Sequence, residues 1–123
     1  MAKPKRDPIR EDRIQNEVVV DAYGPEEQAM GWYYYLEEKL RFPFTAKCGT
    51  ERAISPLRKG DEVEIVGMAS ADECGHEMFV ETPWERRTLA IPLAQVQPIA
   101  GTDAATKEAI EDWHYLVNQG YEF

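Results

Sequence analysis

The chain has 123 residues, a net charge of −9 at pH 7 and 43% hydrophobic residues. These values predict one folded domain with its own core and exclude an intrinsically disordered protein. No apolar run approaches the roughly 20 residues that span a bilayer, and the charged N-terminus leads into no signal-peptide core. We therefore expect a soluble, cytoplasmic protein with no membrane partner.

The charge is divided unevenly along the chain. Residues 1–13 contain five basic and three acidic side chains, whereas the other 110 residues contain nine basic and twenty acidic ones and carry −11. Such an acidic body repels the phosphate backbone, so we expect no nucleic-acid partner. It attracts divalent cations and basic proteins instead, although acidity that serves only solubility is the simpler alternative.

The N-terminal part is predicted to contain a tail and a helical hairpin. Residues 1–10 hold two prolines and several charges, which favours a flexible basic tail. In residues 11–23 apolar side chains recur at helical spacing, although residues 18–20 would suit a strand equally well. Gly24-Pro25 ends this segment and begins a second helix that runs to about Arg41.

After Pro43 the sequence changes to short alternating runs that predict five β-strands. A final helix, capped by Thr102 or Asp103, is expected to end at Gly120. Residues 11–123 are thus predicted to form one α+β domain. It would contain a small SH3-like five-stranded barrel, flanked by an N-terminal helical hairpin and a C-terminal helix. The predicted strands cover residues 44–48, 62–68, 77–82, 88–91 and 97–99.

The first candidate metal ligands are Glu37 and Glu38, in the last turns of the second helix. The sequence contains no EF-hand loop, so a calcium site must combine separate segments. Two carboxylates are unfavourable at a helix C-terminus, where the dipole is already negative, unless a cation or the nearby Lys39 or Arg41 offsets them. An ordinary charged helix end is the alternative interpretation.

The second group of candidate ligands is Asp72 and Glu73, in the loop after the second strand, with Glu77 just beyond it. If the first two strands form a meander, Phe44 would lie near residues 67–68. The end of the second helix would then approach the loop, and the two segments would share a cation. A flexible loop that offers carbonyl oxygens suits calcium better than magnesium.

Two further acidic groups have simpler interpretations. The run at residues 61–64 places two carboxylates on one strand face, which commonly meets solvent. Glu108, Glu111 and Asp112 lie opposite the apolar stripe of the last helix and are predicted to be solvated. A second cation site is the alternative there.

Cys48, Cys74 and His76 offer an alternative site for a soft metal such as zinc. Two cysteines make no disulfide framework in a cytosolic chain, and we expect both to be reduced. The remaining histidine, His114, lies on a remote helix, which weakens this interpretation. Because the sequence has no phosphate-binding loop and no nucleophile motif, we expect no enzymatic activity.

Several aromatic strings, occurring in one order over most of the chain beyond residue 13, give it a specific resemblance. The strings are Asp21-Ala-Tyr-Gly24, Met30-Gly-Trp-Tyr-Tyr-Tyr-Leu36, Phe42-Pro-Phe44, Met78-Phe-Val80, Leu89-Ala-Ile-Pro-Leu93 and Ile110-Glu-Asp-Trp-His-Tyr115. In these strings the chain resembles the CcbP-like family, the small acidic calcium-binding proteins described from cyanobacteria. The resemblance implies a compact α/β protein that binds Ca²⁺ at exposed acidic sites without EF-hands.

The sequence therefore predicts a non-enzymatic calcium-binding protein that acts as a buffer or a sensor through surface acidic clusters. The alternative is an acidic SH3-like interaction module that docks a basic partner protein, with cation binding incidental. The predicted metal ligands are Glu37, Glu38, Asp72, Glu73 and Glu77.

Overall fold

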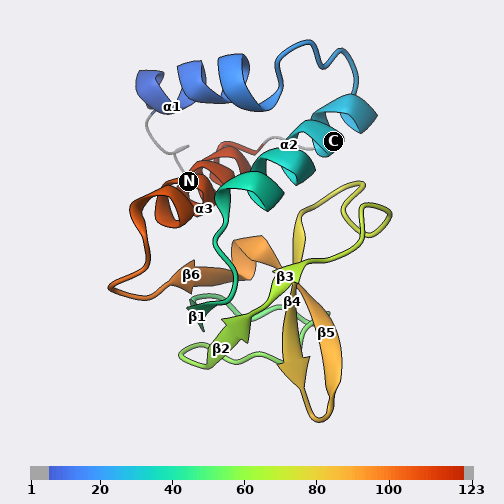
Figure 1. Ribbon diagram of the computed structural model, residues 1–123, viewed down its shortest axis with the longest axis vertical. Coiled ribbons are helices and arrows are strands. Elements are labelled where there is room, and N and C mark those ends of the chain that lie inside the picture. Colours follow the sequence, from blue (N-terminus) through green and yellow to red (C-terminus); the bar gives the residue numbers. More distant parts are fainter. Residues whose placement is uncertain (1–5, 121–123) are drawn as a thin grey trace.

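Within residues 6–120, which the computed structural model describes, three α-helices lie together on one side of two small antiparallel sheets (Figure 1). None of these helices has the length and apolar character needed to cross a bilayer. The helices are α1 (Pro8–Arg13), continued by a π-helical turn η1 (Ile14–Val18), α2 (Pro25–Lys39) and α3 (Ala104–Asn118). The strands are β1 (Phe44–Cys48), β2 (Glu62–Ile65), β3 (Gly67–Met68), β4 (Phe79–Trp84), β5 (Arg87–Pro92) and β6 (Val96–Pro98), with a 3-10 turn η2 (Leu93–Gln95) before β6.

Helix α1 begins inside the segment that was predicted to be a flexible tail. The carboxylate of Asp7 accepts hydrogen bonds from two backbone N–H groups of the first turn, at 3.0 and 3.2 Å, and Pro8 occupies the first helical position. A capping aspartate followed by proline is a strong helix start. The tail predicted over residues 1–10 is therefore too long, because it includes the first three residues of α1. Residues 1–5 lie outside the described residues.

The helical hairpin is confirmed. The chain is helical from α1 through Val18, which decides between the helix and the strand that the sequence left open. Gly24 then adopts an extended conformation at the N-cap of α2, with Pro25 in its first turn. The helix ends at Lys39, slightly before the predicted end at Arg41.

The strand predicted over residues 62–68 divides at Val66 and contributes to two sheets. One sheet has the order β2-β1-β6 and the other β3-β4-β5. Val66 leaves the first ladder and donates its N–H to the carbonyl of Glu81 in β4, at 2.9 Å. The hydrogen bonds of the described strands thus form two three-stranded sheets and no closed five-stranded barrel.

This division also refines the predicted position of Phe44. Phe44 pairs with Ile65, two residues before Gly67, while Gly67 and Met68 pair with β4. The loop after β3 is therefore positioned by the second sheet.

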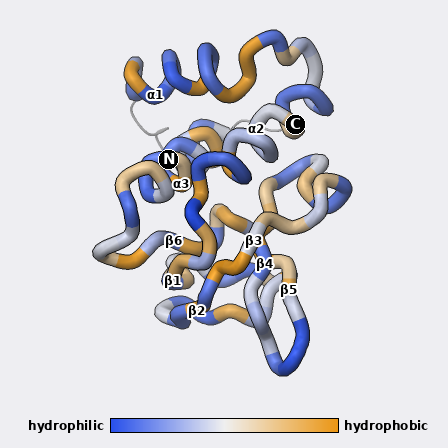
Figure 2. The backbone as a smooth tube through the Cα atoms, viewed as in Figure 1, coloured by the Kyte–Doolittle hydropathy of each residue, from blue (hydrophilic) through white to orange (hydrophobic). Residues whose placement is uncertain are grey.

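The core joins the helices to both sheets. Trp32 of α2 and Trp113 of α3 meet edge to face, with ring centroids 5.1 Å apart. Leu36 of α2, Ile65 of the first sheet and Ile91 of the second are fully buried beneath them. Figure 2 shows the tip of the β4–β5 hairpin as hydrophilic, away from this core.

Asp112 of α3 is fully buried, although the sequence predicts it to be solvated with Glu108 and Glu111. Its oxygens accept hydrogen bonds from Arg10 Nη1 and from Arg13 Nε and Nη2, each at 2.7 Å. These hydrogen bonds raise the pKa of Arg13. The two glutamates contact the same arginines from more exposed positions, at 3.2 Å (Glu111–Arg10) and 3.6 Å (Glu108–Arg13). Guanidinium groups replace the solvent around Asp112. Both oxygens of its carboxylate are bound by arginine side chains, which does not support the alternative of a second cation site there.

Asp112→Asn should lower the free energy of unfolding by about 2–3 kcal/mol, because two arginines lose their buried counter-charge. The figure is below the full cost of breaking a buried pair, since both arginines keep some solvent contact. Glu111→Gln, which removes one charge from the same cluster at a more exposed position, should cost less than about 1 kcal/mol. Urea denaturation measures the free energy of unfolding of the two variants. Equal losses would contradict the conclusion that Asp112 is the main partner of the two arginines.

His114 connects α3 to the turn before β6. Its Nε2 donates a hydrogen bond to the carbonyl of Leu93, at 3.2 Å. Burial lowers the pKa of His114, and the carbonyls of Leu93 and Val96 and the charge of Glu111 oppose this shift. The imidazole is therefore held in its neutral form in the folded protein.

We expect part of the stability to be lost as the pH falls below about 6.5, the ordinary histidine pKa. Below this pH the imidazole binds a proton in the unfolded chain but stays neutral in the folded protein. The free energy of unfolding therefore falls by at most about 1.4 kcal/mol per pH unit, down to the pKa of His114 in the folded state. His114→Gln should flatten the dependence of the unfolding free energy between about pH 7 and 5.5. The exposed His76 provides the control, since His76→Gln should leave this dependence in place. An unchanged slope in His114→Gln would show that other groups cause it.

Candidate metal-binding segments

The last turns of α2 present Glu37 and Glu38 to solvent. The last helical hydrogen bond runs from the N–H of Leu40 to the carbonyl of Leu36, at 2.8 Å. The carbonyls that follow Leu36 have no helical donor, as at any helix C-terminus. Exposed carboxylates and outward carbonyl oxygens therefore occur together at this end of α2, which is the chemistry that a hard divalent cation binds.

Tyr33 links this part of α2 to the loop after β3. It lies one helical turn before Glu37 and is half-buried. Burial raises its pKa, and the charge of Glu37 and the thiol of Cys74 add to the shift. Ala71 and Gly75 of the loop line one groove with Met30 of α2, so the loop passes beside the middle of this helix.

The buried thiol of Cys74 anchors the loop. Its Sγ accepts a hydrogen bond from the N–H of Phe79, at 3.3 Å, and burial raises its pKa, which keeps the thiol neutral. The N–H of Ala69 donates to the carbonyl of Phe79 at 3.0 Å and closes the base of the loop. Inside it, Glu73 donates its N–H to the carbonyl of Ser70, at 3.0 Å. The loop thus has a fixed base and carries its acidic side chains on an exposed turn.

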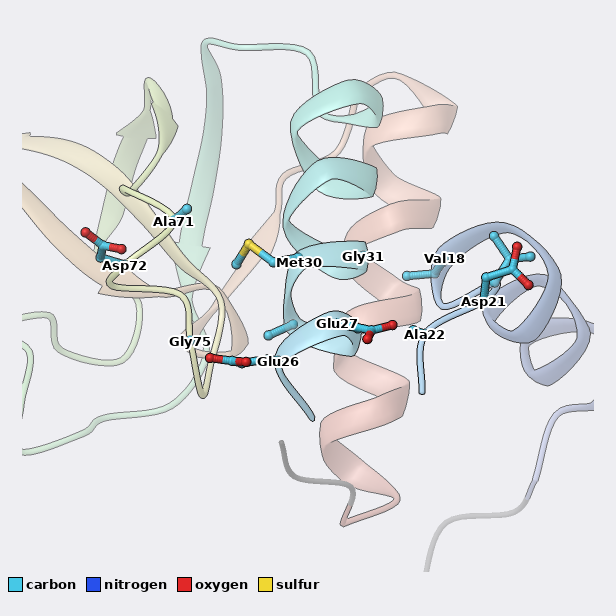
Figure 3. Close-up of a pocket in the computed structure, with 12 residues that line it drawn as sticks. Val18, Asp21, Ala22, Glu26, Glu27, Met30, Gly31, Ala71, Asp72 and Gly75 are labelled. Atoms are coloured by element: carbon cyan, nitrogen blue, oxygen red, sulfur yellow. The ribbon is translucent and has the colours of Figure 1, made fainter. Parts of the chain in front are cut away.

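Asp72 and Glu73 are exposed on this turn, and Asp72 lies beside the first half of α2. Figure 3 shows it across from Glu26 and Met30, with which it lines a groove. Glu38 lies twelve residues beyond Glu26, which corresponds to about 18 Å along a helix. Asp72 therefore shares this groove with the first half of α2, and Glu38 is not among the residues that line it.

Glu77 already forms an ion pair with a basic side chain of the protein. Its carboxylate pairs with the guanidinium of Arg52 through two hydrogen bonds, at 2.5 and 3.1 Å. The hydrogen bonds with Glu77 raise the pKa of Arg52. For Glu77 to bind a metal ion, this ion pair would have to open.

The zinc alternative is not supported by the described residues. Among residues 6–120 no three His, Cys, Asp or Glu side chains are grouped so that they could hold a metal ion. Cys48 is buried and donates its thiol to the carbonyl of Thr50, at 3.2 Å, whereas Cys74 contacts Phe79. His76 is exposed. Both thiols are buried and hydrogen-bonded to the backbone, so the described residues do not form the alternative soft-metal site.

The acidic run at residues 61–64 faces solvent as predicted. Glu62 and Glu64 are exposed on β2 and alternate with side chains of the core. Asp61 has a local role, because its carboxylate accepts the N–H of Arg58 at 2.9 Å.

The structure adds three carboxylates that the sequence analysis did not single out. Asp21, Glu26 and Glu27 line the same groove as Asp72. The two glutamates follow Pro25 in the first turn of α2, where acids are common because the helix dipole favours them. Asp21 has a φ of 59°, in a left-handed conformation that aspartate tolerates. Local patterns explain each residue separately, and only the fold brings them to Asp72.

The fold and these segments define a small acidic α+β protein whose candidate metal-binding carboxylates lie mainly at an exposed helix end and on an exposed loop. A family model described as calcium binding matches residues 12–117, and the chain belongs to this family, the CcbP calcium-binding proteins. The chain is similar to the crystal structure of Anabaena CcbP, with 41% identity and a TM-score of 0.87 over all of both chains. It is also similar to a structure described as a calcium binding protein in the calcium-binding form, with 40% identity and a TM-score of 0.85, again over all of both chains. A comparison with curated proteins gives no match. The resemblance derived from the aromatic strings is thereby confirmed.

Arg52→Gln should strengthen calcium binding if Glu77 is a ligand, because the carboxylate no longer has to leave its guanidinium partner. Since the ion pair is partly exposed, we expect a gain of about 1 kcal/mol, or roughly fivefold in Kd. Arg58→Gln is the matched control, as it removes the same charge without releasing Glu77. Calorimetric titration with calcium measures both, and equal gains would exclude Glu77 from the ligand set.

Proposed function

We propose that this protein binds calcium as a buffer or sensor, without enzymatic activity, through the end of α2 and the loop after β3. The observation that carries this proposal is the similarity of the whole chain to a calcium-binding protein in its calcium-binding form. Membership of a calcium-binding family over residues 12–117 supports it independently of that structure.

The electrostatics of the chain support calcium as the ligand. The net charge of −9 attracts divalent cations, and the predicted ligands Glu37, Glu38, Asp72 and Glu73 are all exposed. Calcium accepts six to eight oxygens in flexible geometry, whereas magnesium requires a near-ideal octahedron and dehydrates reluctantly. Exposed carboxylates with neighbouring carbonyls therefore favour calcium over magnesium.

Two finer features belong to the same proposal. We infer that the two sheets are the halves of an SH3-like scaffold, which the shared strand broken at Val66 and the single turn η2 before β6 support. We also infer a cytoplasmic location, which the two free buried cysteines, Cys48 and Cys74, support.

Glu38→Gln should weaken calcium binding by about 1–3 kcal/mol, or roughly 5- to 150-fold in Kd, because it removes a charged ligand beside the helix-end carbonyls. Glu62→Gln removes the same formal charge from an exposed position on β2 and should change Kd less than about twofold. Calorimetry at physiological ionic strength measures both variants, with magnesium as the competing ion.

Absence of saturation of the wild-type protein by millimolar calcium would overturn the proposed function. Equal dissociation constants for Glu38→Gln and Glu62→Gln would reject the end of α2 as the site, and would assign calcium binding to a diffuse acidic surface.

A further inference from the structure

A groove of about 640 Å³ runs over α2, between the segment that follows η1 and the loop after β3 (Figure 3). Val18, Val20 and Ala22 contribute to one side and Ala71 and Gly75 to the other. In Figure 3 the side chain of Met30 points from α2 toward the loop. The volume falls within the range of ligand-binding clefts, about 300–1,000 Å³.

The charged lining of this groove is entirely acidic. Asp21, Glu26, Glu27 and Asp72 contribute to it, and no basic side chain is among its described lining residues. Glu26 and Asp72 lie on the loop side, and Asp21 lies at the opposite end (Figure 3). Like charges around a concave surface concentrate negative potential there. Both ends of the groove therefore attract cationic groups.

Between these charged ends an apolar strip lies beside Glu27. Val18, Ala29 and Met30 contribute to the strip, and Val18 and Ala29 are buried. Val20 of the lining is 56% exposed, and Tyr23, which follows the lining residue Ala22, is 86% exposed. Methionine adapts to differently shaped ligands, and tyrosine is enriched at protein interfaces.

We propose that this groove binds a short segment of a partner protein in which Lys or Arg side chains flank an apolar residue. The cations of the segment pair with Asp21 at one end and with Glu26 and Asp72 at the other. Its apolar side chain packs on Met30 between them. The proposal goes beyond calcium binding and does not depend on it.

A protein segment fits this surface better than a small polycation does. A polyamine would satisfy the carboxylates but would leave the surface around Met30, Val20 and Tyr23 without an apolar partner. Burying one leucine-sized side chain contributes about 1.5–3 kcal/mol, so the groove distinguishes an amphipathic segment from a purely charged ligand. Charge complementarity provides attraction at a distance and the correct register.

The probe is a fluorescein-labelled peptide, Lys-Arg-Leu-Leu-Arg-Lys, titrated with the protein in EDTA and followed by fluorescence anisotropy. Asp21→Asn/Glu26→Gln should weaken peptide binding about tenfold, because two groove carboxylates lose their charge. Asparagine keeps the left-handed backbone at position 21 accessible, so the fold should be retained. Glu62→Gln/Glu64→Gln is the matched control on β2, and should change binding less than about twofold.

A second pair of measurements tests the apolar part. Met30→Ser, and a peptide with Gly-Gly in place of Leu-Leu, should each reduce affinity about tenfold at unchanged peptide charge. Equal losses in the two double variants would overturn the proposal in favour of diffuse attraction. Undiminished binding of the Gly-Gly peptide, or displacement by spermidine at equal charge concentration, would overturn it in favour of a simple polycation site. Self-association of the protein that Asp21→Asn/Glu26→Gln abolishes would assign the groove to a second copy instead.

The titration in EDTA separates this proposal from the calcium site. Asp21 and Glu26 are not among the predicted calcium ligands, so the double variant should keep its calcium affinity within about threefold. Calcium binding without peptide binding would overturn the groove proposal alone. Peptide binding without calcium binding would overturn the proposed function alone.

Discussion

Asp112 is buried in α3 and accepts hydrogen bonds from Arg10 and Arg13 of the N-terminal helical segment. An isolated buried carboxylate would be costly, and the two guanidinium groups offset that cost only when α1 lies against α3. The ion pair therefore selects one position for the N-terminal segment. That position also determines where residues 18–22 lie beside α2, so one side of the acidic groove depends on a charge pair at the far end of the helical layer.

A second constraint sets how closely the N-terminal segment approaches α2. A Cβ atom at Gly31 would lie 2.5 Å from the carbonyl oxygen of Val18, so only glycine permits this crossing. Glycine inside a helix costs about 1 kcal/mol relative to alanine, and here the cost is offset by the close contact of η1 with α2. In Figure 3 Val18 indeed points toward Gly31. The width of the groove thus follows from a backbone contact that no hydrophobic pattern reveals.

The elements were predictable where local chemistry decides them. Gly24-Pro25 marked the helix boundary, and alternation of apolar residues marked the strands. Asp112 was misplaced because helical periodicity locates a solvent face but cannot show that a second helix covers it. The break at Val66 was missed because the sequence on both sides of it is typical of a β-strand. Only the pairing of the second half with β4 separates the two strands. Asp21, Glu26 and Glu27 were missed because they share a surface with Asp72 only after folding.

The candidate calcium ligands illustrate the same limit and explain what the protein must do to bind an ion. Within residues 6–120 no three acidic, His or Cys side chains are gathered to hold a metal, although Glu37, Glu38 and Asp72 are all exposed. Exposed side chains retain rotamer freedom, so gathering them around calcium costs conformational entropy. The cost is tolerable because waters and carbonyl oxygens can complete the six to eight ligands that calcium accepts. If these side chains are the ligands, calcium has to order only surface groups on a scaffold that its own core folds, and the affinity then follows from how many of them each ion binds.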